Sequence, residues 1–177
     1  MGTIEIIAGC MFSGKTEELI RRLKRAKIAK QNVIVFKPSI DTRYTKNEIC
    51  SHNKNTFDSI PVKNSKDILK YINKNTQVVG VEEIQFFDNN IINIIEELRD
   101  KGIKIICAGL DMDYKGKPFE ITIYLMGVAD KVNKLNAICV KCGNVATMSY
   151  KLTKDNNRIA VGSSELYEAR CRKCWKE

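Results

Sequence analysis

Residues 9–16 read G-C-M-F-S-G-K-T and fit the pattern G-x-x-x-x-G-K-[ST], which is typical of loops that bind nucleotide phosphates. Gly9 and Gly14 free the backbone to curl, so that successive N–H groups can converge on an anion. The pattern assigns Lys15 to the β- and γ-phosphates and the Thr16 hydroxyl to Mg²⁺. The alternative is a glycine turn with an incidental lysine, and the flanking sequence decides between the two.

The flanking residues favour the phosphate loop. Residues 3–8 form a short apolar run that predicts a strand. From Lys15 onward, Leu19, Ile20, Leu23 and Ala26 recur at helical spacing. The sequence therefore predicts the strand–loop–helix order that the motif requires, with the positive end of the helix directed at the phosphates.

The first two-thirds of the chain alternate between strand and helix patterns. Further strands are expected at 33–36, 78–81 and 103–108, and helices at 65–72 and 90–101, with Ser65 as the cap of the first. Residues 38–58 are polar and predict a long loop that contains the only histidine, His52. The alternation predicts an α/β fold, with a mostly parallel sheet flanked by helices on both faces.

Composition places the chain among globular proteins. It has 177 residues, of which 44% are hydrophobic, and a formal net charge of +9. The lysines are scattered without a basic stripe, so an ordinary lysine-rich composition is favoured over a nucleic-acid partner. No apolar run has membrane-spanning length and no secretory signal is visible, so we expect a cytoplasmic protein without a membrane partner.

Composition changes near Ala137, where a small hairpin-type module is expected in place of another strand–helix unit. We therefore expect an ATP-binding α/β domain at 1–136 and a metal-binding domain at 137–177. The second domain contains two Cys-x-x-Cys pairs, formed by Cys139, Cys142, Cys171 and Cys174. Four thiolates complete a tetrahedral shell, so these pairs predict a structural Zn²⁺. Two unrelated pairs, or a redox pair, are the alternatives.

Two acidic residues follow the strand at 78–81. A carboxylate at such a strand end, next to a phosphate loop, is placed to hold Mg²⁺ or to activate an attacking group. Glu82 and Glu83 would point to opposite faces if the strand continued, and so would have different roles. Either could serve the metal shell or act as general base, and a solvated acidic turn is the alternative.

Six collinear motifs carry a resemblance to a known family. They are G-C-M-F-S-G-K-T at 9–16, D-T-R-Y at 41–44, E-E-I-Q-F-F at 82–87, G-L-D at 109–111, K-P-F at 117–119 and the two cysteine pairs. Over nearly its whole length the chain resembles thymidine kinases of the cytosolic, zinc-containing type (type II). The resemblance implies a P-loop NTPase-like (RecA-like) sheet and a small zinc-ribbon domain with a lasso loop over the nucleoside.

The activity implied by the resemblance is transfer of the γ-phosphate of ATP, with Mg²⁺, to the 5′-hydroxyl of thymidine or deoxyuridine in nucleotide salvage. A homotetramer and feedback inhibition by dTTP are also implied. Glu83 resembles the base, with Lys15 and Arg43 stabilising the transferred group. The residues that resemble the ATP and Mg²⁺ site are Gly9, Cys10, Met11, Phe12, Ser13, Gly14, Lys15, Thr16, Asp41 and Glu82. Those that resemble the nucleoside site are Met11, Phe86, Leu110, Tyr114, Ser149, Val161, Gly162, Ser163, Ser164 and Tyr167.

Three residues depart from the family pattern. Glu82 stands where Asp is usual, Cys10 where Pro is common, and Asn53 where Gly is common. Without the resemblance, the apolar members of the nucleoside set would be read as core. A second class of function stays open, in which a phosphate-loop ATPase with a basic zinc ribbon acts on nucleic acid. That class requires a basic surface facing the nucleic acid.

Overall fold

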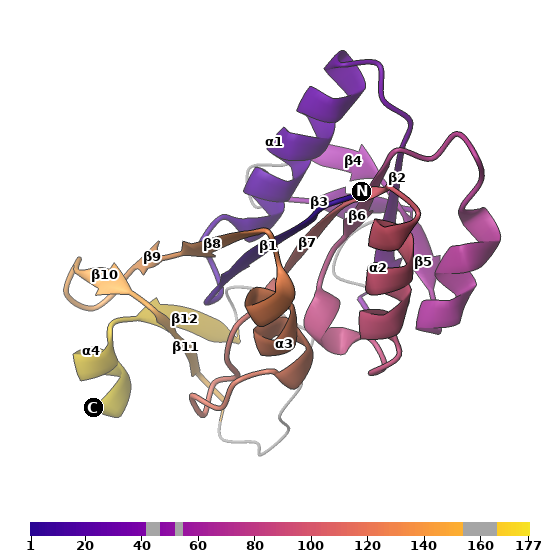
Figure 1. Cartoon of the computed structure of the whole chain (residues 1–177). Coiled ribbons are helices and arrows are strands. Elements are labelled where there is room, and N and C mark those ends of the chain that lie inside the picture. The colour runs from indigo at the N-terminus through magenta and orange to yellow at the C-terminus, as the bar shows by residue number, and fades with distance from the viewer. Residues whose placement is uncertain (42–46, 52–54, 154–165) are drawn as a thin grey trace.

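Figure 1 shows the computed structural model of the chain, which describes residues 1–41, 47–51, 55–153 and 166–177. A six-stranded sheet with the order β5-β2-β6-β7-β1-β8 forms its centre. The strands are β1 (Ile4–Gly9), β2 (Val33–Pro38), β5 (Ile60–Val62), β6 (Val78–Val81), β7 (Lys104–Leu110) and β8 (Lys131–Leu135). All neighbouring strands pair in parallel, which confirms the predicted sheet.

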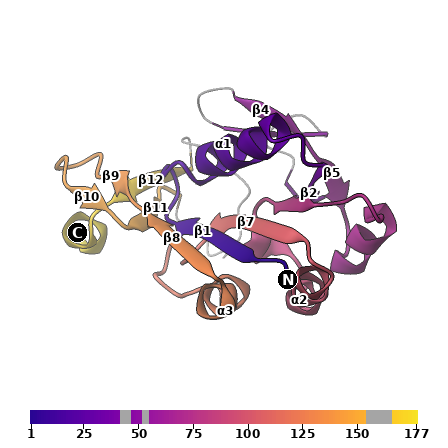
Figure 2. The same cartoon turned by 45° about the horizontal axis from the view of Figure 1, so that its top comes forward.

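Helices cover both faces of this sheet, as Figure 2 shows. Helix α1 (Lys15–Ile28) lies on one face, and α2 (Ile91–Asp100) and α3 (Glu120–Val128) lie on the other. The central strands are buried from both sides, which explains their continuous apolar sequences. The predicted helix after the phosphate loop is confirmed, and the residues that recur at helical spacing, Leu19, Ile20, Leu23 and Ala26, are its buried residues.

A short helix does form near 65–72, but the prediction that Ser65 caps it is wrong. The helix expected at 65–72 is a 3-10 helix, η1 (Ser65–Tyr71), and Ser65 does not cap it. Instead the Ser65 hydroxyl and backbone N–H both donate to the carboxylate of Asp88, at 2.6 and 2.8 Å. The helix N-cap is Asn64. The Ser65 hydroxyl, which was expected to cap the helix, therefore donates to the carboxylate of a residue that is 23 positions away in the sequence.

The polar segment 38–58 is not a loop throughout. Strands β3 (Glu48–Cys50) and β4 (Thr56–Asp58) pair in antiparallel fashion beside α1. Ile49 and Phe57 are buried against the same apolar cluster as the inner face of α1. Burial of these two apolar side chains stabilises the contact between the hairpin and the domain.

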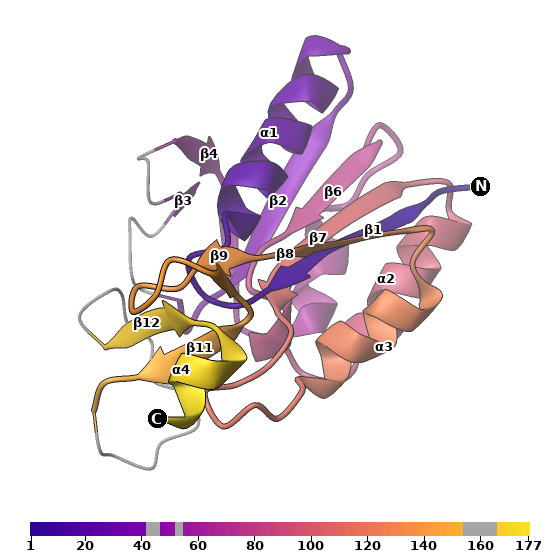
Figure 3. The ribbon, with the colours of Figure 1, turned by 90° about the vertical axis from the view of Figure 1, so that its left-hand side faces the viewer.

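The C-terminal residues form short antiparallel pairs beyond the edge of the sheet. Strand β9 (Ala137–Ile138) pairs with β10 (Val145–Ala146), and β11 (Met148–Lys151) pairs with β12 (Tyr167–Arg170). Helix α4 (Arg172–Lys176) follows, and Figure 3 shows this part beside the loops at one end of the parallel strands. The domain boundary at residue 137 stays a prediction. Within the described ranges, no helix has the length and apolar character needed to cross a membrane.

Candidate active site

The candidate site lies where the central strands end. Strands β6, β7 and β1 are parallel neighbours, so their carboxyl ends share one edge of the sheet. The segments that follow these ends are the phosphate loop after β1, residues 82–86 after β6 and residues 111–119 after β7. Ligands of open parallel sheets bind at this edge.

Backbone geometry explains the glycines of the phosphate loop. A Cβ atom added to Gly9 would lie 2.3 Å from the carbonyl oxygen of Leu135, so any side chain there would clash with backbone of β8. Gly14 has a φ of 82° and is the N-cap of α1. Phe12 also has a positive φ, 64°, which is costly for a residue with a side chain. The loop therefore holds a strained conformation that its neighbours must maintain.

Lys15 and Thr16 connect the loop to its surroundings. Lys15 Nζ donates to the carbonyl of Cys10 at 2.7 Å, and Thr16 Oγ1 donates to Glu82 Oε1 at 2.5 Å. The second bond brings together the two oxygen groups that the sequence assigned to Mg²⁺. Hard oxygen ligands of this kind suit Mg²⁺. Burial lowers the pKa of the Lys15 ammonium, and the negative charge of Glu83 is the largest effect opposing this shift.

Glu83 is held in an unusual conformation. Strand β6 ends at Val81, and Glu83 has a φ of 50°, in the left-handed region. Its side chain is buried and accepts a hydrogen bond from Gln85 Nε2, while Gln85 Oε1 accepts from Leu110 N at 3.0 Å. Glu82 and Glu83 were predicted to point to opposite faces only if the strand continued through them. Strand β6 ends at Val81, so this condition is not met. The two carboxylates nevertheless have different partners, Thr16 for Glu82 and Gln85 for Glu83.

Two buried polar residues at this edge had no predicted role. Gln85 links the candidate base Glu83 to the backbone of Leu110. Asp111 is only 3% exposed, and its Oδ2 lies 3.0 Å from Lys134 Nζ. A carboxylate directly after an apolar strand is the signal that could have indicated Asp111, as it indicated Glu82. Gln85 offered no such signal, because its role depends on Leu110, which lies 25 residues later in the sequence.

Two residues of the predicted nucleoside set, Ser149 and Tyr167, lie on one face of the β11–β12 pair, and Tyr114 lies against this face. Lys151 Nζ lies 4.9 Å from the centroid of the Tyr114 ring. Ser149 is two residues from Lys151 on β11, and Tyr167 is opposite Lys151 on β12, so all three side chains share a face. The hydroxyl of Tyr114 is buried and makes no hydrogen bond to a residue that the structure describes.

Of the remaining predicted site residues, some lie within the described ranges and others lie outside them. Met11 reaches this face through its backbone N–H, which donates to Ser149 Oγ at 3.0 Å. Phe86 makes an edge-to-face contact with Phe119, with ring centroids 6.4 Å apart. Asp41 is buried after the end of β2. The residues that lie outside the described ranges are Arg43, Val161, Gly162, Ser163 and Ser164, together with His52 and Asn53.

The four cysteines predicted to bind metal form one cluster. Their sulfur atoms all lie within 4.8 Å of one another, and Cys142 Sγ is 3.7 Å from Cys171 Sγ. A tetrahedral zinc ion with Zn–S bonds of about 2.3 Å separates its ligands by roughly 3.8 Å. The chain brings the sulfurs together from the β9–β10 turn and the start of α4. The arrangement is compatible with a structural metal site.

Backbone N–H groups around this cluster favour thiolates. The N–H of Cys174 donates to Cys171 Sγ at 3.5 Å, and this hydrogen bond is the main cause of the lowered pKa of Cys171. The pKa of Cys174 rises to about 12, chiefly through its side-chain hydrogen bond with Cys142 and then through burial. Closely spaced thiols cannot all ionise without a compensating positive charge. A divalent metal would compensate the charge of the thiolates.

Comparisons with known proteins agree with the geometry. The model of the family described as thymidine kinase matches residues 2–175. A thymidine kinase of Bacteroides fragilis (strain YCH46) is 47% identical over 99% of this chain and 87% of its own length. A thymidine kinase of Bacteroides thetaiotaomicron is 48% identical over 98% of this chain and 87% of its own length. The phosphate loop, the carboxylates beside it and the four-cysteine cluster thus occur in a chain that belongs to the thymidine kinase family.

Proposed function

We propose that the protein is a thymidine kinase, which transfers the γ-phosphate of ATP to the 5′-hydroxyl of thymidine to give dTMP and ADP. The observation that carries this proposal is the Thr16–Glu82 hydrogen bond beside buried Glu83. It joins the phosphate loop to one of two adjacent carboxylates at one edge of the sheet, in a member of the thymidine kinase family. A phosphate loop alone would support any nucleotide-binding protein.

Glu83 is proposed as the general base. A 5′-hydroxyl is a weak nucleophile, and a carboxylate within hydrogen-bond reach can orient it and accept its proton. The hydrogen bond from Gln85 supports this assignment, because it restrains the carboxylate. Lys15, and Arg43 by resemblance alone, would stabilise charge on the transferred group. The remaining phosphate-loop residues and Asp41 would bind ATP.

Thr16 and Glu82 are proposed to hold Mg²⁺ with ATP. When bound, the ion would neutralise charge on the β- and γ-phosphate oxygens. The longer side chain of Glu82, where the family usually has Asp, still reaches the Thr16 hydroxyl. The metal of the cysteine cluster is proposed to be Zn²⁺, because four sulfur ligands leave no open position for catalysis.

The nucleoside is proposed to bind beside Tyr114 and the strand face that carries Ser149 and Tyr167. Met11, Phe86 and Leu110 would contribute apolar surface, and residues 161–164 would close over the base. The half-buried Tyr114 ring is proposed to stack on the base, a role for which an aromatic residue is needed. Deoxyuridine as an alternative substrate and dTTP as a feedback inhibitor follow from the resemblance and from the same site.

A homotetramer and a cytoplasmic location complete the proposal. Strand β8 is the terminal strand of the sheet, and α3 exposes Ile123, Tyr124 and Val128 beside it. Apolar side chains on an exposed helix next to the terminal strand of a sheet support self-association. The cytoplasm supplies ATP and keeps thiols available to a metal.

The test is release of ADP from MgATP, measured with and without thymidine. We expect release to depend on thymidine and to fall by roughly a hundredfold or more in Lys15→Ala. Glu83→Gln should bind thymidine nearly as well as the parent, with turnover reduced by roughly a hundredfold. Glu82→Gln should change the Mg²⁺ dependence instead. Release stimulated by single-stranded DNA and not by thymidine would overturn the proposal in favour of a nucleic-acid ATPase.

A further inference from the structure

Three successive residues of the phosphate loop contact the cysteine-rich part of the chain. Cys10 Sγ donates to the carbonyl of Ala146 at 3.4 Å, and Met11 N donates to Ser149 Oγ at 3.0 Å. Phe12, with its positive φ, packs against a buried cluster. That cluster consists of Cys10, Ala137, Cys139, Ala146, Ala169 and Cys174. The strained loop is therefore held by residues more than a hundred positions later in the sequence.

The hydrogen bond to Ser149 acts on one particular peptide group. Met11 N–H and the Cys10 carbonyl belong to the same peptide plane. The N–H side donates to Ser149 Oγ, and the carbonyl side accepts from Lys15 Nζ at 2.7 Å and from Ser13 Oγ at 2.8 Å. Because a peptide is planar, the partner on one side fixes the direction of the other. Ser149 thus sets the orientation of the carbonyl that holds Lys15.

We infer that Ser149 is a positioning residue for the phosphate loop, which fixes the 10–11 peptide and through it the Lys15 ammonium. The inference rests on the proposed function, in which Lys15 binds the phosphates of ATP. Ser149 is 5% exposed, so no water replaces its hydroxyl at Met11 N without a rearrangement. Ser149 shares a strand face with Lys151, whose ammonium lies over the Tyr114 ring, so one hydroxyl lies between the two proposed substrate sites.

The experiment measures ATP affinity by calorimetry in the absence of nucleoside, on the full chain. Ser149→Ala should bind ATP about tenfold more weakly, because the 10–11 peptide would turn toward another partner for Met11 N–H and would have to return when ATP binds. Ser149→Thr keeps the hydroxyl and should bind ATP like the parent. Ser59→Ala is the matched control, because the Ser59 hydroxyl is also buried but makes no hydrogen bond to a described residue. It should leave ATP affinity unchanged.

A double-mutant cycle with Lys15→Ala separates positioning from a general loss of structure. If Ser149 acts through Lys15, Ser149→Ala should weaken ATP binding much less in the Lys15→Ala background than in the parent. Additive losses, or unchanged affinity in Ser149→Ala, would overturn the inference. If Ser149→Ala does not fold, the comparison of Ser149→Val with Ser149→Thr decides, since the two have similar shapes. A parent protein that does not bind ATP contradicts the proposed function instead.

Discussion

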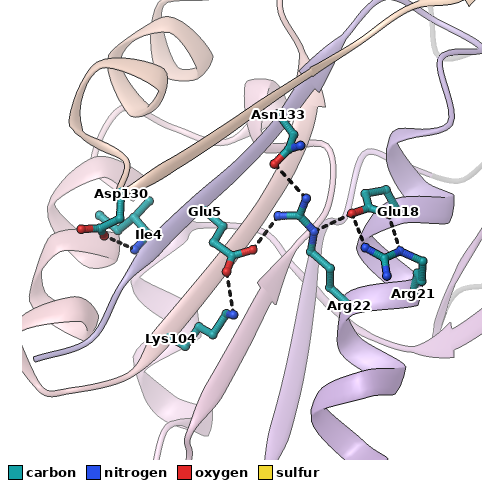
Figure 4. Close-up of polar contacts among 8 residues, drawn as sticks. All are labelled: Ile4, Glu5, Glu18, Arg21, Arg22, Lys104, Asp130 and Asn133. Carbon is teal, nitrogen blue, oxygen red and sulfur yellow. Dashed lines mark hydrogen bonds and ion pairs between the residues drawn. The ribbon is translucent and has the colours of Figure 1, made fainter.

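Arg22 should contribute far more to stability than its neighbour Arg21. Figure 4 shows the Arg22 guanidinium between three partners from three elements. It donates to Glu5 at 2.5 Å, to Glu18 at 2.8 Å and to Asn133 at 3.0 Å, and Lys104 Nζ lies 2.6 Å from Glu5. The Arg22 and Glu5 side chains are only 9% and 13% exposed. These contacts join α1, which begins in the phosphate loop, to β1 and β8.

The expected cost of Arg22→Met follows from the partners that are left. Breaking a buried ion pair by removing one member costs about 3–5 kcal/mol. Glu5 keeps Lys104, and Glu18 keeps Arg21, so the loss should lie at the low end of that range. Met retains the apolar stem of the side chain, which limits the packing loss. We expect the free energy of unfolding to fall by about 3 kcal/mol, or the melting temperature by about 6–12 °C.

Urea unfolding of Arg22→Met and Arg21→Met provides the measurement and its control. Both arginines pair with Glu18, but the Arg21 side chain is 58% exposed. Exposed pairs contribute little, so Arg21→Met should cost less than about 1 kcal/mol. The loss in Glu5→Gln combined with Arg22→Met should be smaller than the sum of the single losses. Equal losses in the two arginine variants would refute the reasoning that burial decides the difference.

Three other predictions concern acid stability, the metal and the nucleoside face. Hydrogen bonding from Arg21 is the main cause that lowers the pKa of Glu18 to about 2. Its stabilising effect is complete above the unfolded value of about 4.3 and is lost as the pH falls toward 2. Between those values unfolding should depend less on pH in Glu18→Gln than in the parent, and equal pH dependence would contradict this. Metal analysis should find about one zinc per chain, and chelation should lower the melting temperature; a metal-free protein with the parent's melting temperature would contradict the site. Tyr114→Ala should weaken use of thymidine more than use of ATP, and Tyr114→Phe should be mild; equal losses for both substrates would place Tyr114 in the core.

Local patterns predicted the elements that depend on neighbours in sequence. The strand–loop–helix unit around Gly9 and Lys15 was predictable because its glycines, lysine and helical periodicity lie within one short window. The cysteine cluster was predictable because the spacing within each Cys-x-x-Cys pair fixes two sulfurs in one turn. Ser65 failed as a helix cap because Asp88, which has no local relation to it, takes its hydroxyl.

The sequence by itself determined the parallel sheet, the phosphate loop and which cysteines could meet, since residue type and spacing specify each of them. Only the tertiary structure decided which groups face one another across the site. The Thr16–Glu82, Glu83–Gln85–Leu110 and Met11–Ser149 contacts join segments from different elements. Such contacts leave no periodic trace in the sequence, because packing of the sheet and of the cysteine-rich part creates them. The sequence thus indicated many of the site residues, and only the folded structure determined which of them contact one another.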